Sequence, residues 1–588
     1  MAPLHHASRA VGIFMRQQVN LETTTRNSYL GMTAPRRPNL LATGVIVLLV
    51  VVYGLMVSRF AFNIPKMDDF IQFLGYQHFL ALSGSPKERL LLFFSQPTWD
   101  GGPQSDHRIA VARLAMFFSQ ALFGTINFRF LIALGNAFLI LSFLLLCWSS
   151  LYRANTMIMV PVAILLFSLI HYEASFWSSA ALLYYPAAFF SFVTFYLLAR
   201  NRSLNLVVPA SAASGILAIL SQANGLIVFP VATFVLGLAK RYRMALLFLL
   251  LTALSFALYF WDFSRPRIIP KFEGSIQATY LILKAWVNLL GCAFLHLSSV
   301  AGLVLFASWL ALLRKRYWEK NFTLFCFGAW LIGAMLSVAI GRGSFDYDYS
   351  AVSRYRFYSA LLASVTYLAV LEMLLDREKL KRIVFYAFLS LTSLVYLYGT
   401  PLAYAQAISE SIDAIHDADF YHIAGVTPYS EDGFPTARLA NYLIALNGKL
   451  GAYTYPPRLG KVALPRDVSK LSTGDPSSLS LKYTRIRFQD KAIAVRGDAW
   501  LQGVGCGNTE TLVVVAAEDR KDYFKAERYP RPRYRELLLQ PCRQFSALVN
   551  LRGVPPGSYR LGIAIVRDGT TLLEQLSEHS FIVGDDKQ

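Results

Sequence analysis

Charged residues are scarce in this chain. Asp, Glu, Lys and Arg make up 16% of its 588 residues, whereas hydrophobic residues make up 55% and the mean hydropathy is +0.42. Soluble globular proteins carry about 25% charged residues. The deficit excludes a single soluble domain and indicates that much of the protein surface faces lipid.

Cysteine is also scarce, with five residues in the whole chain. None has CxxC spacing, which argues against a zinc site held by cysteine. Cys147, Cys292 and Cys326 lie in apolar segments, where cysteine usually serves as a small packing residue. Cys506 and Cys542 lie in the polar C-terminal part, and we expect them to form a disulfide if that part faces an oxidising compartment.

Several motifs of soluble enzymes are absent. The sequence contains no GxSxG, no P-loop, no HExxH and no GxGxxG that follows a strand. These absences argue against serine hydrolases, P-loop nucleotide hydrolases, zinc proteases and dinucleotide-dependent enzymes. The chain also has no internal repeat and no low-complexity tract.

Long apolar runs dominate the first 400 residues. A membrane-spanning helix needs about 20 mostly apolar residues. Candidate spans lie at 41–60, 130–150, 157–171, 181–199, 205–220, 224–239, 244–261, 296–313, 321–340, 356–375 and 383–400. The sequence therefore predicts a polytopic α-helical membrane protein with about eleven transmembrane helices.

Basic residues gather in the short joints between these runs. They lie at Arg153, 200–202, 240–243, 314–320 and 376–382. Cytoplasmic loops of membrane proteins carry such an excess of Lys and Arg. With residues 1–38 in the cytoplasm, all these joints are cytoplasmic only if the apolar stretches 108–124 and 275–292 do not span. We therefore expect these two stretches to lie flat in the opposite interface as amphipathic helices.

Four regions follow from this pattern. Residues 1–38, with five Arg and one Glu, form a cytoplasmic basic arm, and 39–400 form the transmembrane domain with a long outer loop at 61–129. Residues 401–475 are a helical or loop connector, and 476–588 are a periplasmic β-sandwich domain. The strands of this domain are expected at 484–488, 492–495, 512–515 and 559–566. This topology is that of a bacterial inner-membrane protein.

Two groups of titratable residues lie in the outer loop. Asp68 and Asp69 form a carboxylate pair that can hold Mg²⁺ or Mn²⁺ against a phosphate, or take a proton from an acceptor hydroxyl. Acids at a helix start also favour its dipole, so a structural role stays open. Further along, His107 can relay a proton and Arg108 can pair with a phosphate, unless Arg108 only reaches to the interface.

His171 and Glu173 mark the outer end of another span, next to tryptophan and tyrosine. Sugars bind against aromatic faces while carboxylates hold their hydroxyls, so we expect His171 and Glu173, together with His107, to contact sugar or acceptor. An aromatic belt at the interface is the alternative. Gln222 and Asn224 form a polar break between two spans, which we interpret as an ordinary turn.

Arginines at the outer edge of the tenth expected span run against the positive-inside trend. Arg342, Arg354 and Arg356 lie there, with Tyr355 among them. Arginine beside a bilayer surface suits the phosphate of a lipid-linked donor. We therefore expect these arginines to bind donor phosphate and Tyr355 to contact sugar or acceptor. Local pairing with the acids of 345–349 is the alternative.

The arrangement of residues 40–400 resembles the GT-C superfamily of membrane glycosyltransferases. The likeness rests on one span, an outer loop with Met67-Asp68-Asp69-Phe70, an interfacial helix ending in Ala121-Leu122-Phe123-Gly124, and Phe128-Arg129-Phe130 at the next span. Ser353-Arg354-Tyr355 is also similar to a stretch of bacterial members. The resemblance implies a GT-C-like catalytic domain in which Asp68 or Asp69 is catalytic. The segment 106–108 departs from the aminoarabinose and mannosyl transferases, so the sugar and the acceptor stay open.

The resemblance implies a glycosyltransferase of EC class 2.4. It would move a sugar from a polyprenyl-phosphate donor to a glycan, lipid or protein of the cell envelope, such as lipopolysaccharide, on the periplasmic face. The C-terminal β-sandwich is similar to domains that hold the acceptor in some members. Expected partners are the bilayer, the donor and the acceptor, with a divalent cation as candidate cofactor. No nucleic-acid partner is expected, because the net charge of +20 comes from the short joints. A transporter or flippase, a surface-polysaccharide polymerase and a non-enzymatic scaffold are the alternatives.

Overall fold

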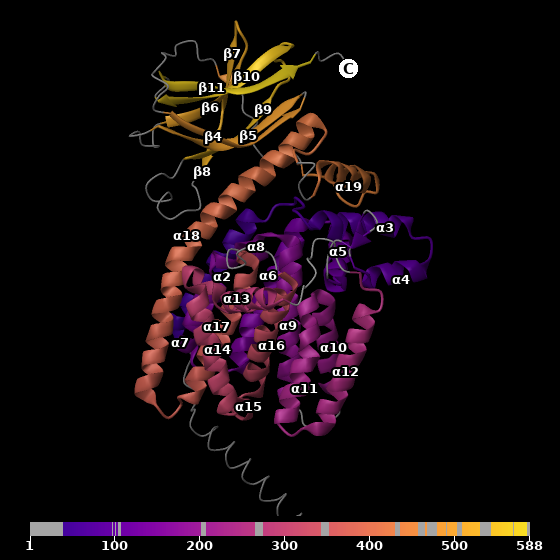
Figure 1. The fold of residues 1–588 in the computed structure, drawn as a ribbon, viewed down its shortest axis with the longest axis vertical. Coiled ribbons are helices and arrows are strands. Elements are labelled where there is room, and N and C mark those ends of the chain that lie inside the picture. The colour runs from indigo at the N-terminus through magenta and orange to yellow at the C-terminus, as the bar shows by residue number, and fades with distance from the viewer. Residues whose placement is uncertain are drawn as a thin grey trace, which may run out of the picture.

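The computed structural model describes most of the chain beyond the N-terminal arm. It covers residues 39–584 apart from 97, 100–101, 104–106, 201–206, 265–274, 343–351, 430–434, 457–464, 467–478, 490, 502–508, 530–542 and 568–569. The predicted basic arm and the predicted disulfide between Cys506 and Cys542 lie outside the described residues. The described residues form a helical bundle with a β-domain at one end (Figure 1).

The bundle is built from long apolar helices. It contains α2 (Leu40–Phe60), α6 (Phe128–Ser149), α7 (Thr156–Leu166), α9 (Ser178–Arg200), α10 (Val207–Ser221), α11 (Val228–Leu238), α12 (Tyr242–Phe260), α14 (Ser298–Arg314), α16 (Phe322–Arg342), α17 (Ser353–Met373) and α18 (Glu378–Ala424). Each candidate span from the sequence overlaps one of these helices. The predicted helical positions are therefore confirmed. The physical reason is that an apolar run in lipid must satisfy its backbone hydrogen bonds internally, as a helix does.

Eight helical segments in the described part of the chain are long and apolar enough to cross a membrane. The chain is therefore a polytopic helical membrane protein. Helices α10 and α11 are shorter, and α17 is buried inside the bundle among the other helices. One of the eight segments, 276–314, joins α14 to the stretch that we expected to lie flat. The count of eleven spans stays a prediction.

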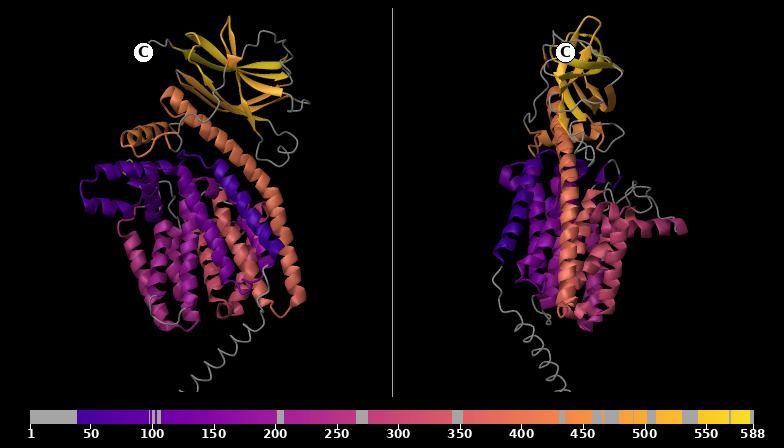
Figure 2. Two further views of the ribbon diagram at one scale, coloured as in Figure 1. Left: turned by 180° about the vertical axis from the view of Figure 1, so that it is seen from behind. Right: turned by 90° about the vertical axis from the view of Figure 1, so that its left-hand side faces the viewer.

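Further helices lie around the ends of the bundle. They are α3 (Tyr76–Leu82), α4 (Pro86–Phe94), α5 (Ala110–Phe123), α8 (Tyr172–Phe176), α13 (Ile276–Gly291), α15 (Tyr317–Lys320) and α19 (Ala437–Lys449). Helices α3 and α4 lie across the upper end of the bundle, and α13 projects sideways from it (Figures 1 and 2). Helices α5 and α13 coincide with the stretches 108–124 and 275–292, whose place at a membrane interface stays a prediction.

Short irregular helices interrupt the regular ones near the β-domain end. They are the π-helix η1 (Phe70–Gly75) and the 3₁₀ segments η2 (Leu169–His171), η3 (Ala223–Ile227) and η4 (Cys292–Leu297). Each break frees backbone groups from the regular helical ladder. The breaks occur where the sequence carries polar residues, so they create the places where a site can form.

Helix α18 joins the bundle to the β-domain. Its 47 residues span about 70 Å, and it continues through Pro401, where the sequence had suggested the end of a span. Its upper half runs along the β-domain (Figures 1 and 2). There Asp413 pairs with Arg496, and Arg485 Nη1 lies 3.4 Å from Asp417 Oδ1. These pairs fasten the β-domain to a rigid helix.

The β-domain consists of two antiparallel sheets. Their strands are β3 (Pro465–Arg466), β4 (Leu479–Gln489), β5 (Ala492–Leu501), β6 (Thr509–Ala516), β7 (Lys521–Lys525), β8 (Glu527–Tyr529), β9 (Gln544–Asn550), β10 (Gly557–Arg567) and β11 (Thr570–Val583); a separate small hairpin pairs β1 (Thr98–Trp99) with β2 (Gly102–Pro103). The sheets have the orders β11-β10-β6-β7-β3 and β4-β5-β9-β8. Val495 and Phe545 of one sheet share a core with Val513 and Ile563 of the other. The four strands predicted from the sequence, three from alternation and 512–515 from a continuous apolar run, are confirmed.

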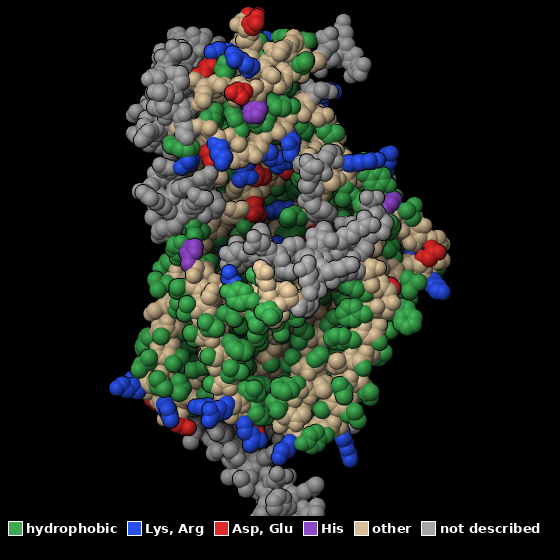
Figure 3. All heavy atoms as spheres, in the orientation of Figure 1, with side chains coloured by type: hydrophobic (Ala, Val, Ile, Leu, Met, Phe, Trp, Pro, Cys, Tyr) green, Lys and Arg blue, Asp and Glu red, His purple; other side chains and the backbone are tan. Residues whose placement is uncertain are grey.

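The surface of the bundle separates by residue type. A broad band of hydrophobic side chains covers it, and Lys and Arg gather at the end away from the β-domain (Figure 3). The joints 240–243, 314–316 and 377–382 contribute these basic residues. The pattern is typical of a helical membrane protein.

Close packing of α6 on α9 gives a test of the bundle. A Cβ on Gly135 would lie 2.5 Å from Ala181 Cβ and 2.8 Å from its carbonyl carbon, so a larger residue must push the two helices apart. We expect Gly135→Val to cost about 1 to 3 kcal/mol and to lower the thermal unfolding midpoint. Gly54→Val on α2 is the control, because a Cβ there meets no atom within 4 Å. Equal midpoints for both variants would contradict the packing.

Candidate functional site

The loop after α2 has a strained backbone. Met67 adopts a φ of +42°, in the left-handed region that residues other than glycine rarely occupy. Asp69 is followed directly by the π-helix η1. Both features cluster at functional sites, where surrounding contacts hold them in place. The loop that carries Asp68 and Asp69 is therefore a candidate functional site.

Asp69 anchors this loop to the start of α9. It is 1% exposed, and its carboxylate accepts hydrogen bonds from the backbone N–H groups of Lys66 (2.9 Å) and Ser179 (3.0 Å). Trp177 Nε1 (3.2 Å) and the Ser179 hydroxyl also donate to it. Burial raises the pKa of Asp69 to about 6, and the hydrogen bonds limit the rise because they stabilise the charged form. With its oxygens committed to these donors, Asp69 holds the loop in place.

Asp68 has a different environment. It is partly exposed and lies close enough to Arg354 of α17 to interact with it electrostatically. Arg354 is also held by Glu173 of α8: its backbone N–H donates to Glu173 Oε2 (3.1 Å), and its Nη1 lies 3.5 Å from the same oxygen. The structure thus brings together Asp68, Glu173 and Arg354, which the sequence offered as separate candidates.

Aromatic rings enclose the Arg354 guanidinium. Its Cζ lies 5.7 Å from the ring centre of Trp177 and 5.4 Å from that of Tyr355. Such cation–π contacts hold the side chain without using its N–H donors. The Arg354 side chain is still 29% exposed. A guanidinium held in this way can bind a phosphate with little rearrangement.

The other two arginines predicted for this region lie at the same end of the bundle. Arg356 Nη1 donates to the carbonyl of Ile170 at 3.3 Å. Arg342 is the last residue of α16. The loop 343–351 that follows, with its acids, lies outside the described residues. Phosphate binding by Arg342 and Arg356 stays a prediction.

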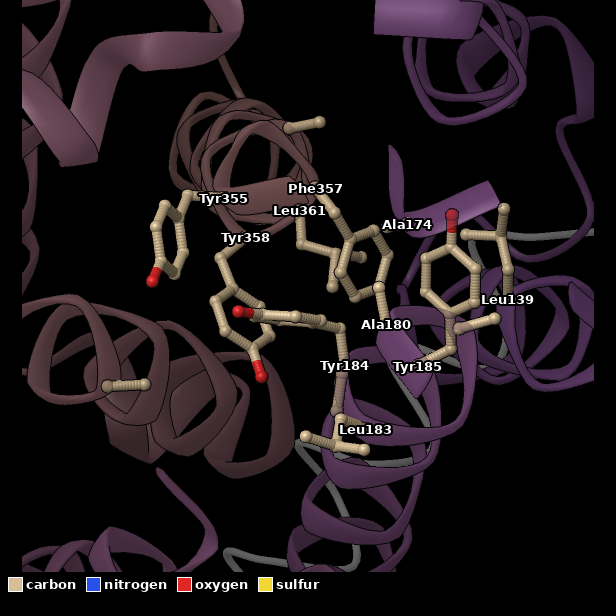
Figure 4. Close-up of a cluster of buried hydrophobic side chains, with 14 of the residues drawn as sticks. Leu139, Ala174, Ala180, Leu183, Tyr184, Tyr185, Tyr355, Phe357, Tyr358 and Leu361 are labelled. Carbon is tan, nitrogen blue, oxygen red and sulfur yellow. The ribbon is translucent and has the colours of Figure 1, made fainter. Parts of the chain in front are cut away.

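His171 is buried beneath the site rather than exposed at it. Its Nε2 lies 2.9 Å from the Leu166 carbonyl, which accepts, so Nδ1 accepts from the Tyr185 hydroxyl at 3.0 Å. Ser175 and Tyr53 extend this polar network into the bundle. In Figure 4, Tyr185 lies on the opposite side of α17 from Tyr355. The network positions α8, which carries Glu173, and contact of His171 with a sugar stays a prediction.

Arg108 makes contacts that hold helices together. Its guanidinium donates to the carbonyls of Tyr259 (3.0 and 2.8 Å) and Phe94 (2.7 Å), and it pairs with Asp262. These contacts tie the ends of α4 and α12 together. His107, just before it, is partly buried. The predicted roles of Arg108 toward phosphate and of His107 toward a proton stay predictions.

The roles of several residues at the site could not be read from the sequence. Ser179 donates twice to Asp69, and the Ser353 hydroxyl accepts from the Glu173 backbone N–H at 3.1 Å. Lys66 Nζ lies 4.0 Å from Glu410 Oε2 of α18, at the side of the β-domain. Figure 3 shows a hollow between the bundle and the β-domain, with acidic and basic side chains in its wall. A single serine or lysine carries no pattern, so only the fold identifies these partners.

The donor set of Asp69 does not suit a metal ion. Its carboxylate receives hydrogen bonds from N–H and O–H groups, which occupy the lone pairs that a cation would need. Among the described residues, no group of three or more His, Cys, Asp or Glu could hold a metal ion. The divalent cation expected from the sequence stays a prediction.

Comparisons with protein-family profiles, with curated protein sequences and with solved structures found no match for this chain. The fold and the site therefore define its class by themselves. That class is a polytopic helical membrane protein with a charged, aromatic site at the end of the bundle that carries the β-domain.

The buried Asp69 predicts a pH dependence of stability. Its folded pKa of about 6 lies above its ordinary value, so between about pH 4 and 6 the unfolded chain has released a proton that the folded chain keeps. Stability therefore falls as the pH rises through this window, by at most about 3 kcal/mol from this group. We expect the difference in unfolding midpoint between the wild type and Asp69→Asn to change over this window and to stay constant above about pH 7. A constant difference at every pH from 4 to 7 would contradict the buried, titrating carboxylate.

Proposed function

We propose that this protein is a GT-C-type glycosyltransferase that moves a sugar from a polyprenyl-phosphate donor to a glycan, lipid or protein of the cell envelope. The convergence of Asp68, Glu173 and Arg354 carries the proposal. They come from segments far apart in the sequence and meet beside a strained loop. A base and an anchored guanidinium at the end of a membrane bundle suit a lipid-linked phosphate donor.

Each of the three groups has a chemical task. Asp68, which is partly exposed, takes the proton of the acceptor hydroxyl as its oxygen attacks the anomeric carbon. The bond between that carbon and the phosphate oxygen breaks, and polyprenyl phosphate leaves with the bonding electrons. Arg354 stabilises the charge that develops on this phosphate, and Glu173 keeps Arg354 in position. A single displacement of this kind inverts the configuration at the anomeric carbon.

The proposal includes a membrane topology. Eleven helices cross a bacterial inner membrane, residues 1–38 lie in the cytoplasm and the β-domain lies in the periplasm. Supporting this, the basic joints gather at the end of the bundle away from the β-domain (Figure 3). The candidate site then faces the periplasm, where envelope acceptors are found.

A transporter or flippase is the second candidate. The buried polar network of Tyr53, Asn136, His171 and Ser175 favours it, because polar groups at membrane depth often mark a transport path. A flippase moves its lipid without breaking the bond between sugar and phosphate. Release of free polyprenyl phosphate therefore separates the two functions, and a polysaccharide polymerase would differ in requiring a glycan acceptor.

Asp68→Asn tests the proposed base. We expect it to reduce sugar transfer by about 10² to 10⁴-fold, because the amide cannot accept the hydroxyl proton. Purified protein is incubated with a panel of polyprenyl-phosphate sugars and envelope extract, and free polyprenyl phosphate is measured. Glu319→Gln is the control, since this exposed acid lies at the opposite end of the bundle. Full activity of Asp68→Asn would contradict the assignment.

Cysteine labelling tests the topology. In a variant whose five native cysteines are replaced by serine, we expect Asp519→Cys on the β-domain to react with an impermeant maleimide in intact spheroplasts. Lys315→Cys at the basic end should react only after the membrane is opened. Both positions are exposed, so protection reflects the membrane alone. The reverse labelling pattern would overturn the topology and the periplasmic site with it.

A further inference from the structure

A second polar cluster lies inside the bundle, next to Arg354. Tyr184, Tyr355 and Tyr358 lie together on one side of α17, whereas Phe357 and Tyr185 lie on the other (Figure 4). The Tyr184 ring lies 5.8 Å from that of Tyr355 and 5.6 Å from that of Tyr358, measured between centres. Arg354 interacts electrostatically with Tyr184 and Tyr355, so it stands at one edge of this cluster.

The break between α10 and α11 supplies amide groups to the same cluster. The Tyr358 hydroxyl donates to Gln222 Oε1 at 2.5 Å. Asn224 accepts through Oδ1 from the Ser337 hydroxyl (2.8 Å), and its carbonyl accepts from Trp330 Nε1 (3.1 Å). Gln222 and Asn224 are 1% and 5% exposed. Burying polar side chains this deeply in a membrane bundle costs free energy, and such residues usually have a function.

One hydrogen-bond donor in this cluster lacks an acceptor at good geometry among the described residues. The Asn224 side chain interacts with the Tyr358 hydroxyl. Its amide nitrogen Nδ2 nevertheless has no acceptor at bonding geometry in the part of the chain that the structure describes. An orphaned buried amide costs free energy comparable to a lost hydrogen bond, so a ligand acceptor is the natural partner. The turn cannot easily move away, because a Cβ on Gly225 would lie 2.3 Å from the Ala218 backbone.

We propose that Gln222, Asn224 and Tyr358, with Tyr184 and Tyr355, form the pocket for the sugar of the donor, and that this sugar is uncharged. This inference rests on the proposed function. In a polyprenyl-phosphate sugar the ring is attached directly to the phosphate, so a phosphate at Arg354 places the sugar beside these tyrosines. The five side chains offer hydroxyls, amides and rings, which match sugar hydroxyls and ring faces.

The five side chains carry no charge, and this is the reason for proposing an uncharged sugar. A uronic acid or an amino sugar would bring its own charge among five buried side chains that carry none, and Arg354 at the edge of the cluster is already paired with the donor phosphate in this arrangement. Burying such a charge without a partner is strongly unfavourable. A neutral hexose or pentose loses only hydrogen bonds to water, which the pocket replaces. The structure therefore favours a neutral sugar over either charged kind.

Binding of matched donors tests this inference without a transfer assay. The full chain in nanodiscs is titrated with undecaprenyl phosphate bearing glucose, glucuronic acid or glucosamine, which share one ring. Undecaprenyl methyl phosphate is the reference, because it is a phosphodiester without a sugar. We expect the glucose donor to bind about tenfold more tightly than the reference, as one or two net hydrogen bonds give, and the charged donors no more tightly than the reference.

Two variants and a control locate the effect. Tyr358→Phe should remove most of the tenfold gain, and Asn224→Asp should remove it and favour glucosamine instead. Tyr367→Phe on the same helix should keep the gain, because its buried hydroxyl donates to the Ile158 carbonyl. If Asn224→Asp does not fold, the comparison of the two tyrosine variants decides the question.

The outcomes separate the two proposals. If the reference lipid binds but the glucose adds nothing, if a charged donor binds most tightly, or if both tyrosine variants behave alike, the sugar pocket is wrong while the proposed function stands. If neither the reference nor any donor binds, both fall together.

Discussion

The carboxylate of Asp69 fixes the geometry on which the candidate site depends. Its four hydrogen bonds tie Lys66 to Trp177 and Ser179, and so join the loop after α2 to the start of α9. This closure holds Met67 in its strained conformation next to Asp68, which interacts electrostatically with Arg354. The same closure brings Trp177 against the Arg354 guanidinium. A buried carboxylate that is fully satisfied by donors can hold such strain, because losing any one contact leaves a buried charge uncompensated.

The sequence was sufficient to predict where the helices lie, since a span in lipid requires a long apolar run. The four expected strands were likewise predictable, three from alternating side chains and 512–515 from a continuous apolar run. The upper half of α18 was not. The expected span ended at residue 400, yet the helix continues to Ala424 because its contacts with the β-domain, Asp413 with Arg496 and Asp417 with Arg485, stabilise the polar part. Those contacts join residues far apart in the sequence, so local pattern could not reveal them.

The sequence was sufficient to predict which residue types belong to the candidate site. It was not sufficient to predict how these residues are arranged in space. Acids after the first span and arginines at a span edge stood out because their placement is costly or unusual there. That Asp69 is buried and anchored, while Asp68 is partly exposed, depends on Ser179, a residue without any sequence signal. His171 and Arg108 stood out in the sequence because of their titratable groups. In the described structure, His171 bonds to Tyr185 and Leu166 and so positions α8. Arg108 bonds to the carbonyls of Tyr259 and Phe94 and so joins the ends of α12 and α4. Asn224, interpreted from sequence as part of a turn, belongs to a buried polar cluster that only the packing of α16 and α17 completes.

The central claim is that a lipid-linked phosphate binds at Arg354, beside Asp68. A cryo-EM reconstruction of the full chain in nanodiscs with undecaprenyl phosphate tests it most directly. The account predicts density for the phosphate in contact with the Arg354 guanidinium, with the lipid chain running down the outside of the bundle. Phosphate density at the basic end of the bundle, or an empty Arg354 beside lipid bound elsewhere, would contradict it.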